Sequence, residues 1–157
     1  MNQDQQQSSI ELLQAEWALL RAALDTSQLS VNKCQAIGNK GLYTFEEQES
    51  FDSLTSKFSR ASDIFTQKVI RTLWILLHEP FMPFIDLMNK CEKMSIVQSA
   101  DQMFEIRDLR NQIAHEYLPD ALQELVPEVI EISAHLNDNA LTCYSFLLQR
   151  NWIPQSP

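Results

Sequence analysis

The stretch from Arg110 to Tyr117 contains the side chains of this chain that are best suited to chemistry on a phosphate ester. Arg110 and Asn111 are followed by His115 and, two residues later, by Tyr117. A guanidinium is a permanent cation with paired donors for phosphate oxygens, and an imidazole exchanges protons near neutral pH. Cleavage of a phosphodiester without a metal needs these residue types.

Helical geometry separates these candidates into two faces. At about 100° per residue, Asn111 and His115 lie one turn apart on a polar stripe with Asp108. Arg110 and Tyr117 lie close to the apolar stripe instead, and Arg110 is roughly 140° from His115. A guanidinium in that position must extend to solvent, pair with an acid or line a cleft. Within one chain Arg110 and His115 could co-operate only if the helix frays before Leu118-Pro119 or if Arg110 curls around the helix. A second copy of the chain would let them meet across a shared groove, so we expect a homodimer.

Each candidate also has a plainer interpretation. A histidine near a helix end is often a surface residue that the helix dipole favours, which would account for His115. Arg110 could pair with an acidic residue of another helix, and Tyr117 could pack with its hydroxyl at the rim of the core. Arg107 and Asp108 are expected to support the site, although Arg107 could equally be solvated or salt-bridged. The combination of residues, rather than any one of them, favours a functional site.

The elements that must position this stretch are predicted to be helices. Apolar residues recur at steps of three and four, and strand-like alternation is absent, which predicts an all-α, up-and-down bundle of four long helices and one short one. The motif lies on the fourth helix, whose apolar stripe is formed by Met103, Ile106, Leu109 and Ile113. The predicted helices span residues 9–26, 45–79 with a bend, 83–93, 100–117, and 120–150 with an interruption near Pro127. Helix starts are expected from the capping-box spacing of Ser8 with Glu11 and Thr44 with Glu47, and at Ser99.

Bulk composition restricts the function classes. The 157 residues predict one domain, with residues 1–8 and 152–157 as frayed tails. No segment has the layout of a signal peptide or approaches the ~20 apolar residues of a membrane span, so no membrane partner is expected. Three cysteines without a Cys-x-x-Cys pair favour reduced thiols and a cytoplasmic location. His78 and His135 lack ligand spacing, so neither a metal nor another cofactor is expected. The net charge of −9 argues against a long RNA-binding track, so contact with RNA would need either a small, focused site or a partner that brings the RNA.

The motif resembles that of the HEPN superfamily, the higher eukaryotes and prokaryotes nucleotide-binding domains. Arg110 with the polar Asn111 and with His115 after three more residues matches the family's signature, on the fourth helix of an all-α bundle. Tyr117, two residues beyond the histidine, is similar to the tyrosine of the HepT toxin branch, which works beside a minimal nucleotidyltransferase antitoxin. The resemblance covers eight residues well and the remaining helical pattern only weakly.

The resemblance implies a metal-independent endoribonuclease that cuts RNA as a toxin or defence effector, acts as a homodimer and contacts a nucleotidyltransferase antitoxin. It implies that His115 moves protons, that Arg110 and Asn111 hold the phosphate, and that the antitoxin attaches AMP to Tyr117. Two alternatives stay open. The same residues could bind a nucleotide without cleavage, in a regulatory partner of a nucleotidyltransferase, or the chain could be a helical adaptor whose motif serves only the dimer interface.

Overall fold

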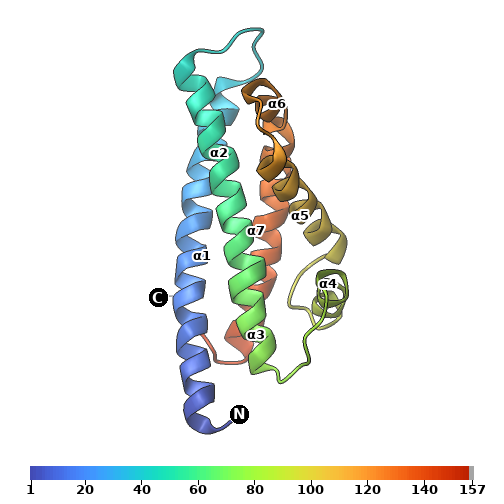
Figure 1. The fold of residues 1–157 in the computed structure, drawn as a ribbon. Coiled ribbons are helices and arrows are strands. Elements are labelled where there is room, and N and C mark those ends of the chain that lie inside the picture. Colours follow the sequence, from blue (N-terminus) through green and yellow to red (C-terminus); the bar gives the residue numbers. More distant parts are fainter. Residues whose placement is uncertain (156–157) are drawn as a thin grey trace.

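The computed structural model describes residues 1–155, and within them it contains helices and no strand. Segments α2, η1 and α3 follow one another without a break and form one long rod (Figure 1). The predicted all-α helical bundle is therefore confirmed. In chain order the elements are α1 (Gln3–Ile37), α2 (Phe45–Asp63), the π-helical η1 (Ile64–Val69), α3 (Ile70–Leu76), α4 (Phe84–Lys93), α5 (Ala100–His115), α6 (Pro119–Glu124) and α7 (Val126–Gln149).

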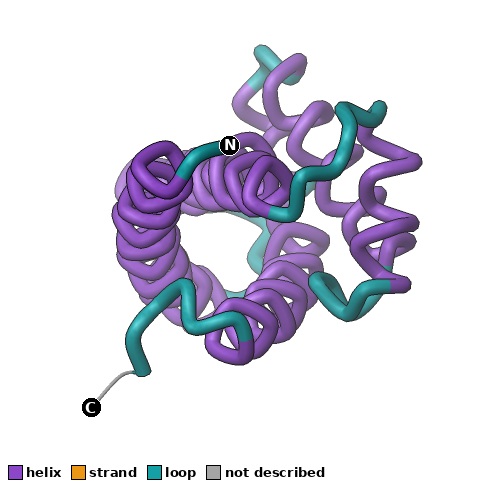
Figure 2. Tube along the Cα trace, turned by 90° about the horizontal axis from the view of Figure 1, so that it is seen from below, coloured by secondary structure: helices purple, strands orange, loops and turns teal. Residues whose placement is uncertain are grey.

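Three long rods form the main body of the bundle. Helix α1, the α2–η1–α3 rod and α7 run side by side along the long axis (Figure 1), and an end-on view shows them as neighbours around one axis (Figure 2). Helix α5 packs against α2 and α7, and α4 packs against α5 (Figure 1). The helix that carries the motif is thus a side layer on the three-rod body, with one face turned toward α2 and another toward solvent.

Apolar side chains at helical spacing fill the interior. The apolar residues at helical spacing on the second predicted helix are all buried, and Leu54, Phe58 and Phe65 have no exposed surface. These residues are Phe51, Leu54, Phe58, Ala61, Phe65, Val69, Leu73 and Leu76. On α5 the stripe residues Met103, Ile106 and Leu109 are buried, and Ile113 is only partly buried. Burial at this spacing supplies the driving force that holds α5 against its neighbours, because each large apolar side chain removed from water contributes roughly 1.5–3 kcal/mol.

The second rod contains a six-residue π-helical segment, Ile64–Val69, in the region where the sequence predicts a bend. A π-helical turn holds more residues than an α-helical turn, so it changes which side chains face a neighbouring helix. Asp63 precedes the segment, and Thr66 within it donates its hydroxyl hydrogen to the carbonyl of Ser62 at 2.9 Å. Segments of this kind occur frequently at functional sites.

Helix α5 begins at a well-formed cap. Ser99 Oγ accepts a hydrogen bond from the backbone N–H of Gln102 at 3.1 Å, which confirms the predicted start. The fully buried Asn139 of α7 accepts the backbone N–H groups of Gln98 and Ser99 at 2.9 and 3.0 Å. Its amide also donates to Gln102 Oε1 at 2.9 Å. A residue of the core thus anchors the start of the helix that carries the motif.

The first helix is longer than predicted, and its start was misplaced. Helix α1 spans Gln3–Ile37 instead of residues 9–26, and its capping box pairs Asn2 with Gln5 rather than Ser8 with Glu11. Glutamine-rich sequence tolerates a helix well, so the polar start does not fray once Asn2 caps it. At the far end, Val31 and Cys34 are buried and continue the helix into what the sequence suggests is a loop.

Both predicted tails are corrected within the described residues. Residues 3–8 belong to α1, and Trp152 and Ile153 are buried against the core. Gln14 Nε2 also donates to the carbonyl of Trp152 at 3.1 Å, which ties this end of the chain to α1. Positions 156 and 157 of the predicted tail lie outside the described residues.

The predicted interruption near Pro127 occurs just before this proline. Helix α6 ends at Glu124, and Pro127 is the second residue of α7. A proline is tolerated in the first turn of a helix because the backbone N–H that it lacks has no partner there. Pro127 therefore belongs to the start of α7 and does not interrupt it.

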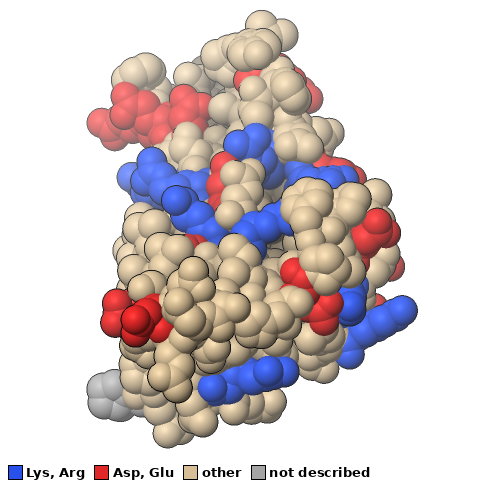
Figure 3. Space-filling model, turned by 60° about the horizontal axis from the view of Figure 1, so that its bottom comes forward, with Lys and Arg blue, Asp and Glu red and all other residues tan. Residues whose placement is uncertain are grey.

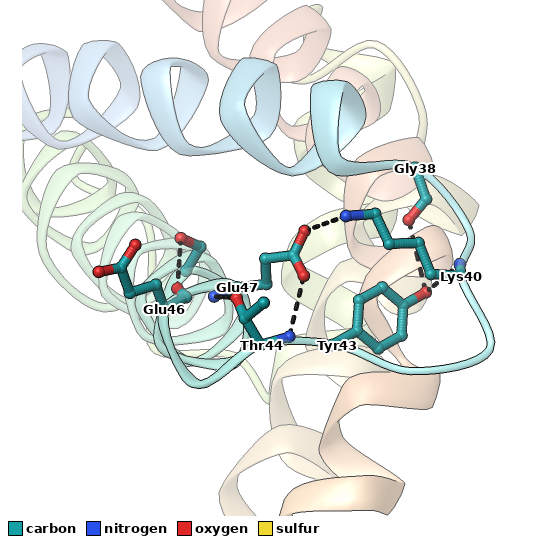
Figure 4. A network of polar contacts seen from close by, with 7 residues as sticks. Gly38, Lys40, Tyr43, Thr44, Glu46 and Glu47 are labelled. Atoms are coloured by element: carbon teal, nitrogen blue, oxygen red, sulfur yellow. Dashed lines mark hydrogen bonds and ion pairs between the residues drawn. The ribbon is translucent and has the colours of Figure 1, made fainter.

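The α1–α2 connection is short and is stabilised by hydrogen bonds and an ion pair. The Thr44–Glu47 capping box is present as predicted, and Lys40 pairs with Glu47 (Figure 4). The Tyr43 hydroxyl accepts the Lys40 backbone N–H at 3.0 Å and donates to the Gly38 carbonyl at 3.4 Å. Gly38 has a φ of 70°, a left-handed conformation in which other residues are strained. This connection lies at the end of the bundle that carries α6 (Figure 1).

Candidate functional site

The Arg110 side chain is held by an acid of the neighbouring rod. Its Nε and Nη2 donate to Oδ1 and Oδ2 of Asp63, and both N–O distances are 2.8 Å. The two side chains are 30% and 32% exposed. Of the three possibilities for this arginine, the structure shows pairing with an acid, and Arg110 lines a pocket as well.

The ion pair orients Arg110 and leaves part of its hydrogen-bonding capacity available. A guanidinium has five N–H groups, and the two bonds to Asp63 leave three of them for a ligand. The hydrogen bonds that Arg110 donates to Asp63 raise the pKa of Arg110 above its ordinary value, so the guanidinium stays charged throughout the neutral range. Because both groups are partly exposed, the pair adds at most about 1 kcal/mol to stability. Orientation is its larger effect.

A basic pocket surrounds Arg110. It has a volume of about 220 Å³, and Arg71, Arg107, Arg110 and Asn111 line it together with polar residues of η1. A second hollow adjoins it, since Asp63 and Gln67 line both. The lining of the two hollows contains five basic residues and one acid, in a chain whose net charge is −9. The basic residues are Arg60, Lys68, Arg71, Arg107 and Arg110.

The space-filling view shows this concentration of basic side chains. With the lower end of the molecule forward, lysine and arginine side chains gather in a band across the face, with few acidic side chains among them (Figure 3). Concentration of one sign of charge in a hollow raises the local concentration of ligands of the opposite sign. An anion is the ligand class that this region favours.

Arg107 has N–H donors that no acidic side chain among residues 1–155 uses. Its guanidinium lies over the Phe84 ring of α4, with Cζ 4.3 Å from the ring centroid. Within residues 1–155 no acid lies at ion-pair distance, and its Nε is buried without a hydrogen-bond partner. A buried donor without a partner costs about 1–3 kcal/mol, which an anionic ligand could recover. Arg107 is therefore not salt-bridged, and it is a candidate phosphate ligand.

His115 and Tyr117 lie apart from this pocket. His115 is the last residue of α5 and is exposed, and no side chain among residues 1–155 forms a hydrogen bond or ion pair with its imidazole. Glu116 is extended, so the chain leaves the helix at this point. Tyr117 is 85% exposed, which excludes its packing in the core of this chain.

The structure thus brings some of the predicted residues together and separates others. Arg107, Arg110 and Asn111 line one pocket, whereas His115 lies outside its lining. Asp108 is exposed and also lies outside the lining. Asn111 connects the two regions, because it lines the pocket and lies one helical turn before His115.

Several pocket residues have no signal in the sequence. Asp63 and Arg71 are ordinary polar positions of a long amphipathic helix, 47 and 39 residues before Arg110. Thr66 and Gln67 belong to the π-helical segment, which nothing in the local sequence announces. An apolar stripe predicts the buried face of a helix, but it does not say which residues of another helix a polar side chain will meet.

The cysteines do not contribute a second reactive centre. Cys34, Cys91 and Cys143 are free and buried. Burial raises the pKa of Cys91 to about 12 and also raises the pKa of the other two thiols. Protonated, buried thiols are poor nucleophiles and poor metal ligands. Their role is to fill space in the core.

Metal clusters and membrane-spanning helices are both absent from the described part of the chain. No group of three or more His, Cys, Asp or Glu side chains there is arranged to hold a metal ion. Nor does any helix within residues 1–155 combine the length and the apolar character needed to cross a membrane. The pocket at Arg110 is the candidate that combines charge, free donors and the sequence motif.

Comparison of the chain with models of known protein families, with curated proteins and with solved structures gave no match. The resemblance to the HEPN superfamily rests on the residues of the motif and on their place in α5, the fourth helical segment when α2, η1 and α3 are counted as one rod. Membership of that family stays a prediction.

Proposed function

We propose that this chain is a metal-independent endoribonuclease whose active site is completed in a homodimer. The single observation that carries the proposal is the pocket at Arg110, where a guanidinium positioned by Asp63 lies beside Arg107 and Asn111 in an otherwise acidic chain. His115 stands free at the end of the same helix. The pocket holds the scissile phosphate, and His115 exchanges protons with the reacting oxygens.

The chemistry follows from these side chains. The 2′-oxygen of the ribose attacks phosphorus, and the bond from phosphorus to the 5′-oxygen breaks. Imidazole takes the proton that the 2′-hydroxyl loses or supplies the proton that the leaving 5′-oxygen gains. Arg110 donates to the phosphate oxygens, whose charge rises in the pentacovalent transition state. The products are a 2′,3′-cyclic phosphate and a free 5′-hydroxyl, and the reaction needs no metal ion.

The helix geometry supports a second copy in the proposed site. Helix α5 is continuous through His115, so Arg110 and His115 remain roughly 140° apart on one chain. The Arg110 side chain is also fixed toward α2 by Asp63 and cannot curl toward the end of α5 without breaking two hydrogen bonds. In the proposed dimer, Arg110 of one copy and His115 of the other face the same phosphate.

Mixing two inactive variants tests this arrangement. Arg110→Ala and His115→Ala each lose RNA cleavage, and co-refolded mixtures regain about a quarter of the wild-type rate, because half of the dimers are mixed and each mixed dimer has one intact site. Gln112→Ala, an exposed change on the same helix, serves as the control. If purified wild-type protein leaves RNA intact, the ribonuclease is excluded. Activity without recovery in the mixture would place both residues in one chain and contradict the shared site.

The regulation implied by the resemblance is included in the proposal. A nucleotidyltransferase antitoxin attaches AMP to Tyr117, whose 85% exposure makes the hydroxyl accessible. The added negative charge and bulk near the end of α5 repel RNA from the site. Induced expression then arrests growth, and His115→Ala abolishes the arrest. Co-expression with a neighbouring nucleotidyltransferase gene adds the mass of one adenylyl group to the Tyr117 peptide, and Tyr117→Phe prevents the addition.

One observation favours the non-catalytic alternative, a nucleotide-binding or regulatory partner of a nucleotidyltransferase. Within residues 1–155 no side chain orients the imidazole of His115, whereas Arg110 is positioned by two hydrogen bonds. Binding of a nucleotide needs the positioned arginine but not an oriented imidazole. Wild-type dimer that binds a nucleotide at the Arg110 pocket but leaves total RNA intact would establish this alternative in place of the enzyme.

A further inference from the structure

A large aromatic side chain is exposed beside the basic pocket. Phe81 lies in the connection between α3 and α4 and is 82% exposed. Its ring centroid is 5.3 Å from Cζ of Arg71, which lines the pocket. A phenyl ring left almost entirely in water gains nothing from burial in this chain, so its contribution to the folded state is small. A flat, exposed ring next to a guanidinium is suited to stacking with a planar ligand.

Arg71 joins the ring to the pocket. Its Nη1 donates to the Met82 carbonyl at 3.3 Å, which ties the guanidinium to the α3–α4 connection. Among residues 1–155 no acid lies at ion-pair distance from Arg71 or from Arg107 on the opposite element. Two arginines without acidic partners therefore line one small hollow, and an exposed aromatic ring lies at Arg71.

The size of the hollow limits what it can enclose. Its volume of about 220 Å³ is below the range of about 300–1,000 Å³ that is typical of sites for whole small molecules. A phosphate group is the anionic part of a ligand that fits such a space and uses the planar donors of arginine. Anything attached to that phosphate must lie outside the hollow, where Phe81 is available.

We propose that Arg71, Arg107 and Phe81 form a nucleotide-binding subsite, in which the phosphate in the hollow is the scissile one of the proposed function and the unpaired base of an adjoining nucleotide stacks on Phe81. The inference rests on the proposed function for the choice of RNA as ligand, and it names where a nucleotide of the strand is held beside the cleavage position. Stacking on aromatic rings combined with arginine contacts to phosphate is the usual way in which proteins bind single strands. A duplex cannot use Phe81, because its bases are already stacked and paired.

Binding of a labelled oligoadenylate to the full-length protein, measured by fluorescence polarisation at low salt, tests the stacking contact. Phe81→Ala is expected to weaken binding about tenfold, the usual effect of removing one stacked base contact. Phe45→Ala is the matched control, because Phe45 is another phenyl ring with 73% exposure, at the start of α2. Both changes are at exposed positions, so thermal unfolding is expected to stay at the wild-type temperature. Equal affinity of Phe81→Ala and wild type overturns the proposal.

A second pair of variants tests the phosphate contact. Arg71→Ala is expected to weaken binding and to lower the slope of log affinity against log salt by about one, since one phosphate contact is lost. Arg150→Ala is the control, because Arg150 also lies over aromatic rings, those of Phe146 and Trp152, near the other end of the chain. An equal loss in the control means that net charge alone governs affinity, and this outcome contradicts the subsite.

Competition with AMP identifies the form of the ligand. If AMP displaces the oligoadenylate from wild type but not from Phe81→Ala, a single nucleotide is sufficient for the subsite. If AMP fails while unlabelled oligoadenylate competes, the subsite needs a strand. A base-paired duplex is expected to compete poorly, and a duplex that binds as tightly as the single strand excludes a role for stacking.

Failure of this inference and failure of the ribonuclease are distinguishable. His115→Ala is expected to keep Phe81-dependent binding although it cannot cleave. Phe81-dependent binding by a wild-type protein that cuts no RNA would leave the subsite in place and remove the enzyme. Cleavage of oligoadenylate at equal rates and equal half-saturating concentrations by wild type and Phe81→Ala would remove the subsite and leave the enzyme.

Discussion

The two halves of the motif on α5 differ in how firmly the fold holds them. Arg110 makes two hydrogen bonds of 2.8 Å to Asp63 and lies in a pocket shared with two further arginines. His115, five residues later, is exposed at the last helical position and has no partner among residues 1–155. Only the first half is organised within a single copy of the chain.

The contrast separates binding from proton transfer. Binding of a phosphate needs donors that are already oriented, and the Asp63–Arg110 pair provides this orientation in the isolated chain. Proton transfer needs an imidazole within hydrogen-bond reach of a reacting oxygen, and among the described residues of one copy no side chain holds His115 toward the pocket. We infer that anion binding is a property of the monomer and that cleavage is a property of the assembly.

The largest expected effect is on the rate of RNA cleavage when the His115 imidazole is removed. Loss of the imidazole in His115→Ala is expected to lower the rate of RNA cleavage by about 10²–10⁴, the usual contribution of a general acid or base. Affinity for oligoadenylate and the unfolding temperature are expected to stay unchanged, because His115 is exposed and lies outside the pocket lining. Single-turnover cleavage with Gln112→Ala as control measures the effect. A variant that cleaves at the wild-type rate would assign the chemistry elsewhere.

A smaller effect on the cleavage rate is expected when Arg110 loses the acid that orients it. Asp63→Asn keeps the shape of the side chain but replaces one of the two acceptor oxygens with a donor, so Arg110 loses its bidentate partner. Cleavage is expected to fall about tenfold through poorer positioning. Oligonucleotide affinity is expected to fall less than the rate, because removal of the negative charge of Asp63 offsets part of the loss of orientation of Arg110. A parallel loss of affinity and rate would contradict the separation of binding from chemistry.

The pH dependence of the two halves should differ as well. The hydrogen bonds to Asp63 raise the pKa of Arg110 above its ordinary value, so Arg110 loses its charge only at a higher pH than a free arginine does. Oligonucleotide affinity of His115→Ala is therefore expected to be flat from about pH 6 to pH 9, where arginine does not titrate. Wild-type cleavage is expected to vary by several-fold or more over the same interval. A step in the binding curve of His115→Ala would identify another titrating group in the pocket.

The smallest expected effect is on stability. Arg110→Ala is expected to change the free energy of unfolding by no more than about 1 kcal/mol, because both partners of the ion pair are partly exposed. Thr44→Ala is a useful comparison, since loss of this helix cap costs about 1 kcal/mol. Urea denaturation measures both variants. A much larger loss for Arg110→Ala would mean that the pair serves the fold rather than a ligand.

Sequence reasoning was most successful where local rules decide the outcome. The apolar spacing of Phe51 to Leu76 predicts a buried face that the structure confirms, and the Thr44 and Ser99 caps lie at the predicted helix starts. It failed at α1, where a polar, glutamine-rich start forms helix from Gln3 instead of fraying. Trp152 and Ile153 were also assigned to a tail, although an end segment becomes ordered when it has core to cover.

The sequence alone determined the all-α class, the place of the motif on its helix and the separation of Arg110 from His115, because these depend on helical periodicity and on the chemistry of side chains. Only the tertiary structure decided that Asp63 holds Arg110, that Arg71 and Arg107 join it, and that Phe81 is exposed beside them. Such partners lie tens of residues apart in the chain. They meet because two helices pack in one particular register, and a single-helix pattern contains no information about that register.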